Sequence, residues 1–160
     1  MTPASSTNNH CNHTPENHNN PDNSSDSNNS ANRGSNTSTG ADSNKILVGV
    51  AIALSGSQAD AGKRQFLCIM TAVKWVNEVY GGVKLYGKKI PLELRCYDDE
   101  SKKGLVISYV EMLITVDMLN FLVAPYSSLL AFAAAPVAKK YRVLMVKSRG
   151  ASDYINEQGF

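Results

Sequence analysis

The first 44 residues of this 160-residue chain contain no Val, Ile, Leu, Phe, Tyr or Trp. In their place stand 12 Asn and 14 Ser or Thr residues. A segment of this composition cannot bury enough apolar surface to offset the entropy that folding removes. We therefore predict that residues 1–44 are a disordered Asn/Ser-rich tail and that residues 45–160 form the folded domain.

Residues 45–160 contain no histidine, no glycine-rich phosphate loop and no GxSxG or HExxH motif. A Ser-His-Asp or Cys-His catalytic group cannot be built without an imidazole. The tail holds three histidines and one cysteine, but no second cluster completes a tetrahedral metal site. The sequence thus predicts a protein that is not an enzyme and that uses neither a cofactor nor a metal.

The sequence also lacks a large excess of positive or negative charge. The tail carries four acids and one arginine, a charge of −3, so a total of +2 leaves +5 on residues 45–160. This positive charge is scattered, and without a basic stripe interleaved with aromatics we predict no nucleic-acid partner. The longest apolar stretch, residues 129–138, is too short to span a bilayer, and no secretory signal opens the sequence as written.

The three cysteines make neither a CxxC pair nor a metal-ligand spacing. Cys68 lies in a segment with helical periodicity and Cys96 in an apolar run that is typical of a strand. Small, weakly polar side chains at such positions usually fill space in a core. We therefore expect both to be core residues.

Residues 45–160 alternate between short apolar runs and longer amphipathic segments. The apolar runs predict strands at 46–54, 88–97, 119–124 and 143–146, and the periodic segments predict helices at about 62–80, 106–117 and 128–140. Such alternation is typical of an α/β fold with an open parallel sheet and flanking helices. Ligands of such sheets bind outside the carboxyl ends of the strands, which places the site among residues 55–62, 98–101, 125–128 and 148–153.

The turn Pro125-Tyr126-Ser127-Ser128 places two hydroxyls and free backbone N–H groups at a predicted helix start. This arrangement suits a carboxylate or a similar anion. The alternative is that a serine only caps the helix, as serines commonly do. The later loop Gly150-Ala151-Ser152 has the same character, because small residues let the backbone approach a ligand closely.

Asp98 and Asp99 follow the predicted strand 88–97 and admit two interpretations. Paired carboxylates at a strand end could hold a divalent metal, which would open an enzymatic hypothesis. Carboxylates also stabilise the start of a following helix through its macrodipole. We favour the second interpretation, because the first strand ends in Ser55-Gly56 and supplies no further carboxylate.

These pieces together resemble the type I periplasmic binding proteins, in the group of branched-chain amino acid and amide receptors of ABC importers. The resemblance rests on five segments in order: ILVGVAIALSG, AVKWVNEVYGGV, GKKIPLELRCYDDES, FLVAPYSSLLAFAAAPVAKKYRVLMV and GASDYINEQGF. It covers essentially all of residues 45–160. Because members of the family are roughly twice as long or more, the resemblance implies an incomplete first lobe.

The resemblance implies a solute-binding domain for a small amino-acid-like or amide ligand. In that family the serine turn after the third strand holds the carboxylate-like end of the ligand, and the loop after the fourth strand adds backbone and hydroxyl contacts. Carried over, these contacts fall on Tyr126, Ser127, Ser128, Gly150, Ala151 and Ser152. The implied partner is a membrane permease and the implied location is extracytoplasmic. The alternative is a ligand-sensing ectodomain fragment of a membrane signalling receptor, joined to a membrane module.

Overall fold

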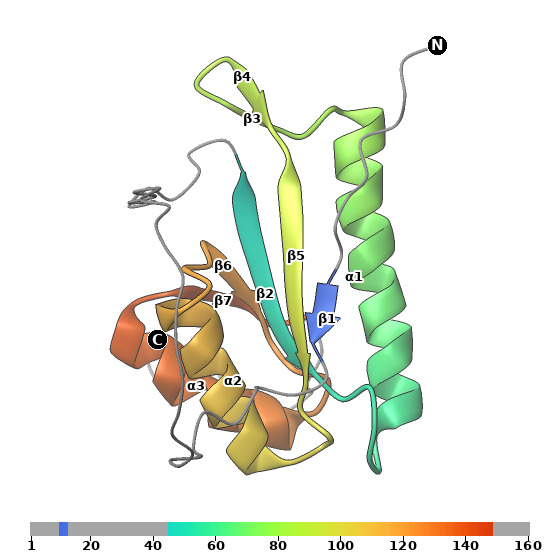
Figure 1. Cartoon of the computed structure of the whole chain (residues 1–160), viewed down its shortest axis with the longest axis vertical. Coiled ribbons are helices and arrows are strands. Elements are labelled where there is room, and N and C mark those ends of the chain that lie inside the picture. Colours follow the sequence, from blue (N-terminus) through green and yellow to red (C-terminus); the bar gives the residue numbers. More distant parts are fainter. Residues whose placement is uncertain (1–9, 13–44, 149–160) are drawn as a thin grey trace, which may run out of the picture.

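The structure of the chain is a computed structural model that describes residues 10–12 and 45–148 (Figure 1). Its strands are β1 (His10–Asn12), β2 (Ile46–Ile52), β3 (Val83–Leu85), β4 (Lys88–Ile90), β5 (Leu92–Asp98), β6 (Phe121–Val123) and β7 (Leu144–Val146). Its helices are α1 (Ala59–Val79), α2 (Lys103–Thr115) and α3 (Ser128–Tyr141).

Five strands form one parallel sheet in the order β1-β5-β2-β6-β7, and β3 and β4 form a separate antiparallel hairpin. The central strand β2 pairs with β5 on one side and with β6 on the other. The arrowheads of β2 and β5 point to the same edge of the sheet, where α1 begins (Figure 1). The carboxyl ends of the strands therefore meet at one edge, as a parallel sheet requires.

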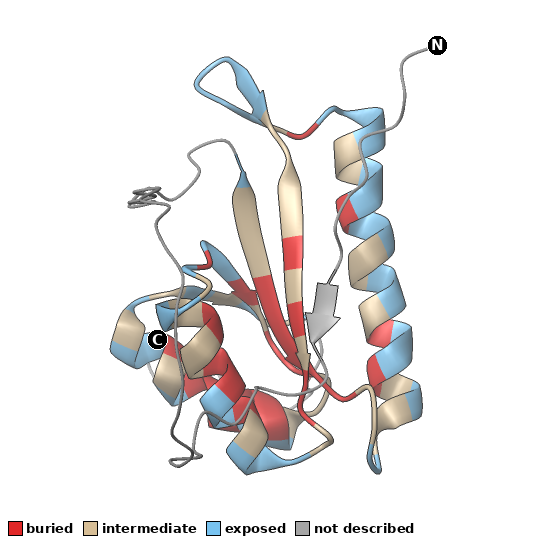
Figure 2. Ribbon diagram, in the orientation of Figure 1, coloured by how far each residue is buried: buried red, intermediate tan, exposed pale blue. Residues whose placement is uncertain are grey.

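The carboxyl half of β2 is buried on both faces, and its residues Val50, Ala51 and Ile52 have no exposed surface. One core cluster joins Val50 and Ile52 to the inner side of α1, and a second joins Ala51 to α2 and α3. Figure 2 shows this as buried segments in the strands and on the sheet-facing sides of the helices, with exposed residues on their outer sides. The helices on both faces of the sheet thus explain why residues 46–54 form an almost continuous apolar run.

The direction of the connections reverses at β2. From β2 the chain crosses through α1, on one face, to β5; from β5 and then from β6 it crosses through α2 and α3 on the other face. The loops that leave the adjacent strands β2 and β6 consequently diverge toward opposite faces. A crevice between such diverging loops, the switch point, is where open α/β sheets bind ligands.

The predicted α/β class with an open parallel sheet and flanking helices is confirmed. One predicted strand is wrong in detail: residues 88–97 divide into β4 and β5, because Pro91 lies between them and cannot donate to a strand ladder. The predicted helix at about 62–80 corresponds to α1, whose residues Phe66 and Ile69 join the core. Tyr80 lies beyond the last turn, is half exposed and meets the ring of Trp75 edge-on.

Strand β1 was not predicted, because its three residues belong to the Asn-rich segment without large apolar side chains. It pairs in parallel with β5, and the register sets Cys11 opposite Cys96. Cys96 is buried, as expected, and is disulfide-bonded. The expectation that Cys68 lies in the core is wrong, because this free cysteine is on the exposed side of α1.

Gly62, in the first turn of α1, lets the helix backbone lie directly against the carboxyl end of β2. A methyl group added at this position would overlap the carbonyl oxygen of Ala53. We expect Gly62→Ala to lower the free energy of unfolding by about 1–3 kcal/mol, because backbone cannot move aside as a side chain can. Urea denaturation followed by circular dichroism measures this change.

Gly104 provides a matched control, since it is also helical but a methyl group there would meet nothing within 4 Å. Gly104→Ala should leave stability unchanged or raise it by up to about 1 kcal/mol, through the higher helix propensity of alanine. Equal effects of the two substitutions would contradict the close approach of α1 to β2.

Candidate ligand-binding site

Three described loops meet at the carboxyl edge of the sheet: residues 53–58 after β2, residues 99–102 after β5 and residues 124–127 after β6. The first two are joined by hydrogen bonds, and the third is joined to α1 by a buried side chain. The candidate site is the region between the first and the third loop, because these loops follow the adjacent strands whose connections diverge.

The Asp98 carboxylate fixes the loop after β2. Its Oδ1 accepts hydrogen bonds from the backbone N–H groups of Leu54 at 2.9 Å, Ser55 at 3.1 Å and Glu100 at 3.0 Å. Burial raises the pKa of this carboxyl, but hydrogen bonds from Ser55 and from the three amides outweigh burial and lower it overall. An ionised Asp98 therefore stabilises two loops at once.

Ser101 and Gly56 also hold the first two loops together. The Ser101 hydroxyl donates to the Ser55 carbonyl oxygen and accepts from the Gln58 N–H, each at 3.0 Å. Gly56 has a φ of 79° and packs against the backbone of Glu100 so closely that a side chain would overlap it. The left-handed conformation and the close approach both require glycine at this position.

Asp99 has a different role from its neighbour. Its Oδ1 accepts a hydrogen bond of 2.8 Å from the Ser101 N–H. Burial raises the pKa of Asp99 to about 6; the Ser101 bond opposes this shift and the nearby Asp98 charge adds to it. The prediction that the two carboxylates stabilise the start of α2 is wrong in detail, because they bind amides of the loops and no side chain caps α2.

The serine turn after β6 has two serines with distinct roles. Ser127 is the N-cap of α3, and its Oγ accepts a hydrogen bond of 3.2 Å from the Leu130 N–H. Helix geometry leaves the amides of Ser128 and Leu129 without an intrahelical acceptor. The turn therefore presents two amide donors and the Ser128 hydroxyl at the positive end of the α3 macrodipole, which suits an anionic group.

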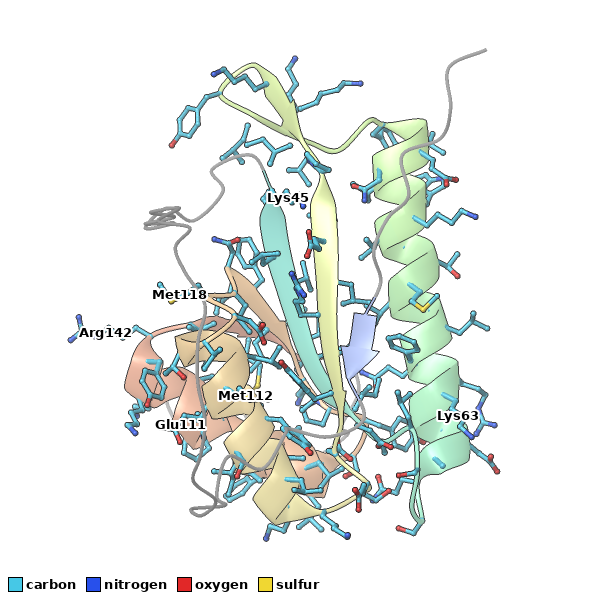
Figure 3. The ribbon with its side chains drawn as sticks, in the orientation of Figure 1. Lys45, Lys63, Glu111, Met112, Met118 and Arg142 are labelled. Atoms are coloured by element: carbon cyan, nitrogen blue, oxygen red, sulfur yellow. The ribbon has the colours of Figure 1, made fainter. Side chains whose placement is uncertain are left out.

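Gln65, on the sheet-facing side of α1, links α1 to the serine turn. It is 5% exposed, whereas Lys63, labelled on α1 in Figure 3, is exposed. The Gln65 Nε2 donates to the Ala124 carbonyl oxygen at 3.1 Å and to the Ser148 Oγ at 3.0 Å. One side chain thus joins α1 to the carboxyl ends of both β6 and β7.

The structure places half of the predicted site residues. Tyr126, Ser127 and Ser128 are all partly buried in the turn at the switch point. Gly150, Ala151 and Ser152 lie outside the described residues, so their part in the site stays a prediction. Gln65 was missed, because a glutamine between Arg64 and Phe66 fits an amphipathic helix equally well on its polar side, and only the tertiary contacts show it buried.

The metal interpretation of Asp98 and Asp99 gains no further ligands from the fold. Over residues 10–12 and 45–148, no group of three or more His, Cys, Asp or Glu side chains gathers where it could hold a metal ion.

Of the three helices that the structure describes, none is both long enough and apolar enough to cross a membrane.

The fold defines the class of the protein: an open α/β domain with a switch point at the carboxyl edge of its sheet. Residues 45–160 match the sequence model of the periplasmic binding protein family, and the chain belongs to that family. The predicted family is therefore confirmed.

Solved structures with similar folds agree. The branched-chain amino acid transporter substrate-binding protein LivJ from Streptococcus pneumoniae, in complex with isoleucine, has a TM-score of 0.65 and 25% identity over 71% of this chain and 31% of that chain. A solute-binding protein of an ABC transporter from Rhodopseudomonas palustris, in complex with 3,4-dihydroxybenzoic acid, has a TM-score of 0.60 and 26% identity over 72% and 30%. The leucine-binding protein LivK from Thermotoga maritima is similar in fold, with a TM-score of 0.59 and 18% identity over 71% and 30%. The chain spans about a third of the length of these proteins.

The raised pKa of Asp99 gives the protein a specific pH dependence. Because the folded state holds this proton up to about pH 6 and the unfolded state only to about pH 4, the associated stability is present at low pH and is lost as the pH rises through about 6. Asp99→Asn removes the charge and keeps an oxygen acceptor for Ser101. Relative to wild type, its free energy of unfolding should rise by about 1–2 kcal/mol between pH 4 and pH 7, as urea denaturation would show.

Asp98→Asn is the matched control with the opposite sign. The pKa of Asp98 is lowered, so its stabilisation is present above about pH 4 and is lost as the pH falls. This variant should be less stable than wild type at pH 7 and approach it toward pH 3. The same pH trend in both variants would contradict the assignment of the two carboxyls.

The capping bond of Ser127 predicts a difference between the two serines. Ser127→Ala should lower the free energy of unfolding by about 1 kcal/mol, because the Leu130 N–H loses its acceptor. Ser128→Ala should change it by less than about 0.5 kcal/mol. Thermal and urea denaturation of both variants test this, and equal losses would mean that Ser127 is not the cap.

Proposed function

We propose that residues 45–160 form the first, ligand-contacting part of an extracytoplasmic solute-binding protein that serves an ABC importer. The proposed ligand is a small amino-acid-like or amide molecule. The serine turn at the switch point is the observation that carries this proposal, since Ser127 is engaged as the cap while the Ser128 hydroxyl and the amides of Ser128 and Leu129 remain to receive a carboxylate.

The ligands of two solved relatives support an anionic group on the proposed ligand. The LivJ and R. palustris proteins were crystallised with isoleucine and 3,4-dihydroxybenzoic acid, and both of these ligands carry a carboxyl group. A helix start with free N–H groups favours such a group by roughly 0.3–2 kcal/mol for each contact. The rest of the ligand differs greatly between the two proteins, so the carboxylate end is the shared chemistry.

We extend the proposed site to Gly150, Ala151 and Ser152, which follow β7. Strands β6 and β7 are adjacent and parallel, and the bonds of Gln65 bring Ser148 beside Ala124. Gly150, Ala151 and Ser152 therefore follow closely in sequence on a residue that lies beside the start of the serine turn. The family supports a non-enzymatic role, a membrane permease as partner and an extracytoplasmic location, and a disulfide at Cys96 fits an oxidising compartment.

A titration of the isotope-labelled 160-residue chain with L-isoleucine tests the proposal. We expect the backbone amide resonances of Ser128 and Leu129 to shift in nuclear magnetic resonance spectra. Because the chain spans only 31% of LivJ, we expect binding to be far weaker than micromolar. A micromolar dissociation constant corresponds to a binding free energy of about −8 kcal/mol. Low-micromolar affinity, or shifts confined to another part of the surface, would contradict this.

Ser128→Asp separates binding from folding in the same titration. A carboxylate in the first turn of α3 stabilises the helix through its macrodipole, yet it repels the carboxylate of the ligand. We expect unchanged or slightly higher stability and no shifts with L-isoleucine. Ser128→Asn, of similar size and without charge, is the control and should retain them.

A further inference from the structure

Gln65 is a polar side chain in a position that packing alone would give to leucine or methionine. On α1 it lies on the same side as Gly62, Phe66 and Ile69, which face the sheet, and it is 5% exposed. Burying an amide costs free energy unless its polar atoms are paired. The hydrogen bonds that this amide makes, and those it does not make, therefore indicate the role of Gln65.

The two donors of the amide are used, and its acceptor is not. The Ala124 carbonyl oxygen can only accept, so the amide atom facing it at 3.1 Å must be Nε2. The second Nε2 proton is donated to the Ser148 Oγ. This fixes the orientation of the amide and leaves Oε1 buried, with no hydrogen-bond partner among the residues that the structure describes.

The unpaired oxygen lies at the proposed binding edge. It belongs to the same planar group as Nε2, which contacts Ala124 three residues before the cap Ser127. A carbonyl oxygen therefore lies near a turn whose open groups, the amides of Ser128 and Leu129, are donors. An α-amino acid carries the complementary pair, an N–H donor next to a carboxylate acceptor.

We propose that Gln65 is a specificity-determining residue whose Oε1 accepts a hydrogen bond from an N–H of the ligand, and so selects amino or amide ligands over carboxylic acids without nitrogen. The inference rests on the proposed binding of a carboxylate at the serine turn. A buried acceptor left unpaired costs about 1–3 kcal/mol, so a ligand that supplies the donor gains relative to one that cannot.

The test compares L-isoleucine with 3-methylpentanoate, which has the same carbon skeleton and carboxylate but no amino group. In titrations of the 160-residue chain we expect wild type to prefer L-isoleucine by about tenfold, and Gln65→Met to bind the two with equal affinity. Lys63→Met is the matched control, because Lys63 is on the same helix but is exposed. It should keep the tenfold preference.

A second measurement needs no variant and so does not depend on the folding of Gln65→Met. The side-chain NH₂ resonances of Gln65 in wild type should shift with L-isoleucine and not with 3-methylpentanoate. Equal affinity of wild type for both ligands, or loss of the preference in Lys63→Met, would overturn the role of Gln65 and leave carboxylate binding intact. Failure of both ligands to bind wild type would instead overturn the proposed function and this inference with it.

Discussion

The structure depends on the burial of β2 on both of its faces. A strand with apolar residues on both sides needs a helical layer on each, so the crossover from β2 through α1 and the crossover from β5 through α2 must run on opposite faces of the sheet. Small residues make this close packing possible: a methyl group at Gly49 would meet the side chains of Leu113 and Leu119, and one at Gly62 the backbone of Ala53. The diverging loops at the carboxyl ends of β2 and β6 are the geometric consequence, and they create the switch point.

The polar groups at this edge divide into those that build the loops and those that remain open. Asp98 and Ser101 are engaged by the loop after β2 and hold it against the loop after β5. Ser127 is engaged as the cap of α3. At the described residues of the serine turn and of α1 beside it, the groups that remain open are neutral dipoles, namely two helix-end amides, one hydroxyl and the oxygen of Gln65. The Asp98 carboxylate therefore shapes this edge, and under the proposed function uncharged groups are left to meet a ligand.

The sequence was sufficient for the fold and for part of the site, and the limit has a physical cause. Continuous apolar runs and periods of three and four residues report burial, which is why β2, α1 and the alternation of strands and helices were predictable. Hydrogen bonds between distant segments leave no such local pattern. Asp98 bonds to Leu54, 44 residues away, and Gln65 to Ser148, 83 residues away. The roles of Asp98 and Gln65 consequently required the structure, whereas the capping of α3 by Ser127 was local and could be anticipated.

The uncharged character of the open groups bears on how a single lobe can contribute to recognition. Under the proposed function, amides at the start of α3 attract any carboxylate, so they supply orientation and little discrimination. An acceptor beside them changes this, because hydrogen-bond polarity penalises a ligand that lacks the donor, whereas shape complementarity to an apolar group discriminates far less sharply. Discrimination between classes of ligand then resides in the first lobe even where most of the contact area lies elsewhere. In this protein that discrimination would depend on one buried amide whose orientation is set by the ends of β6 and β7.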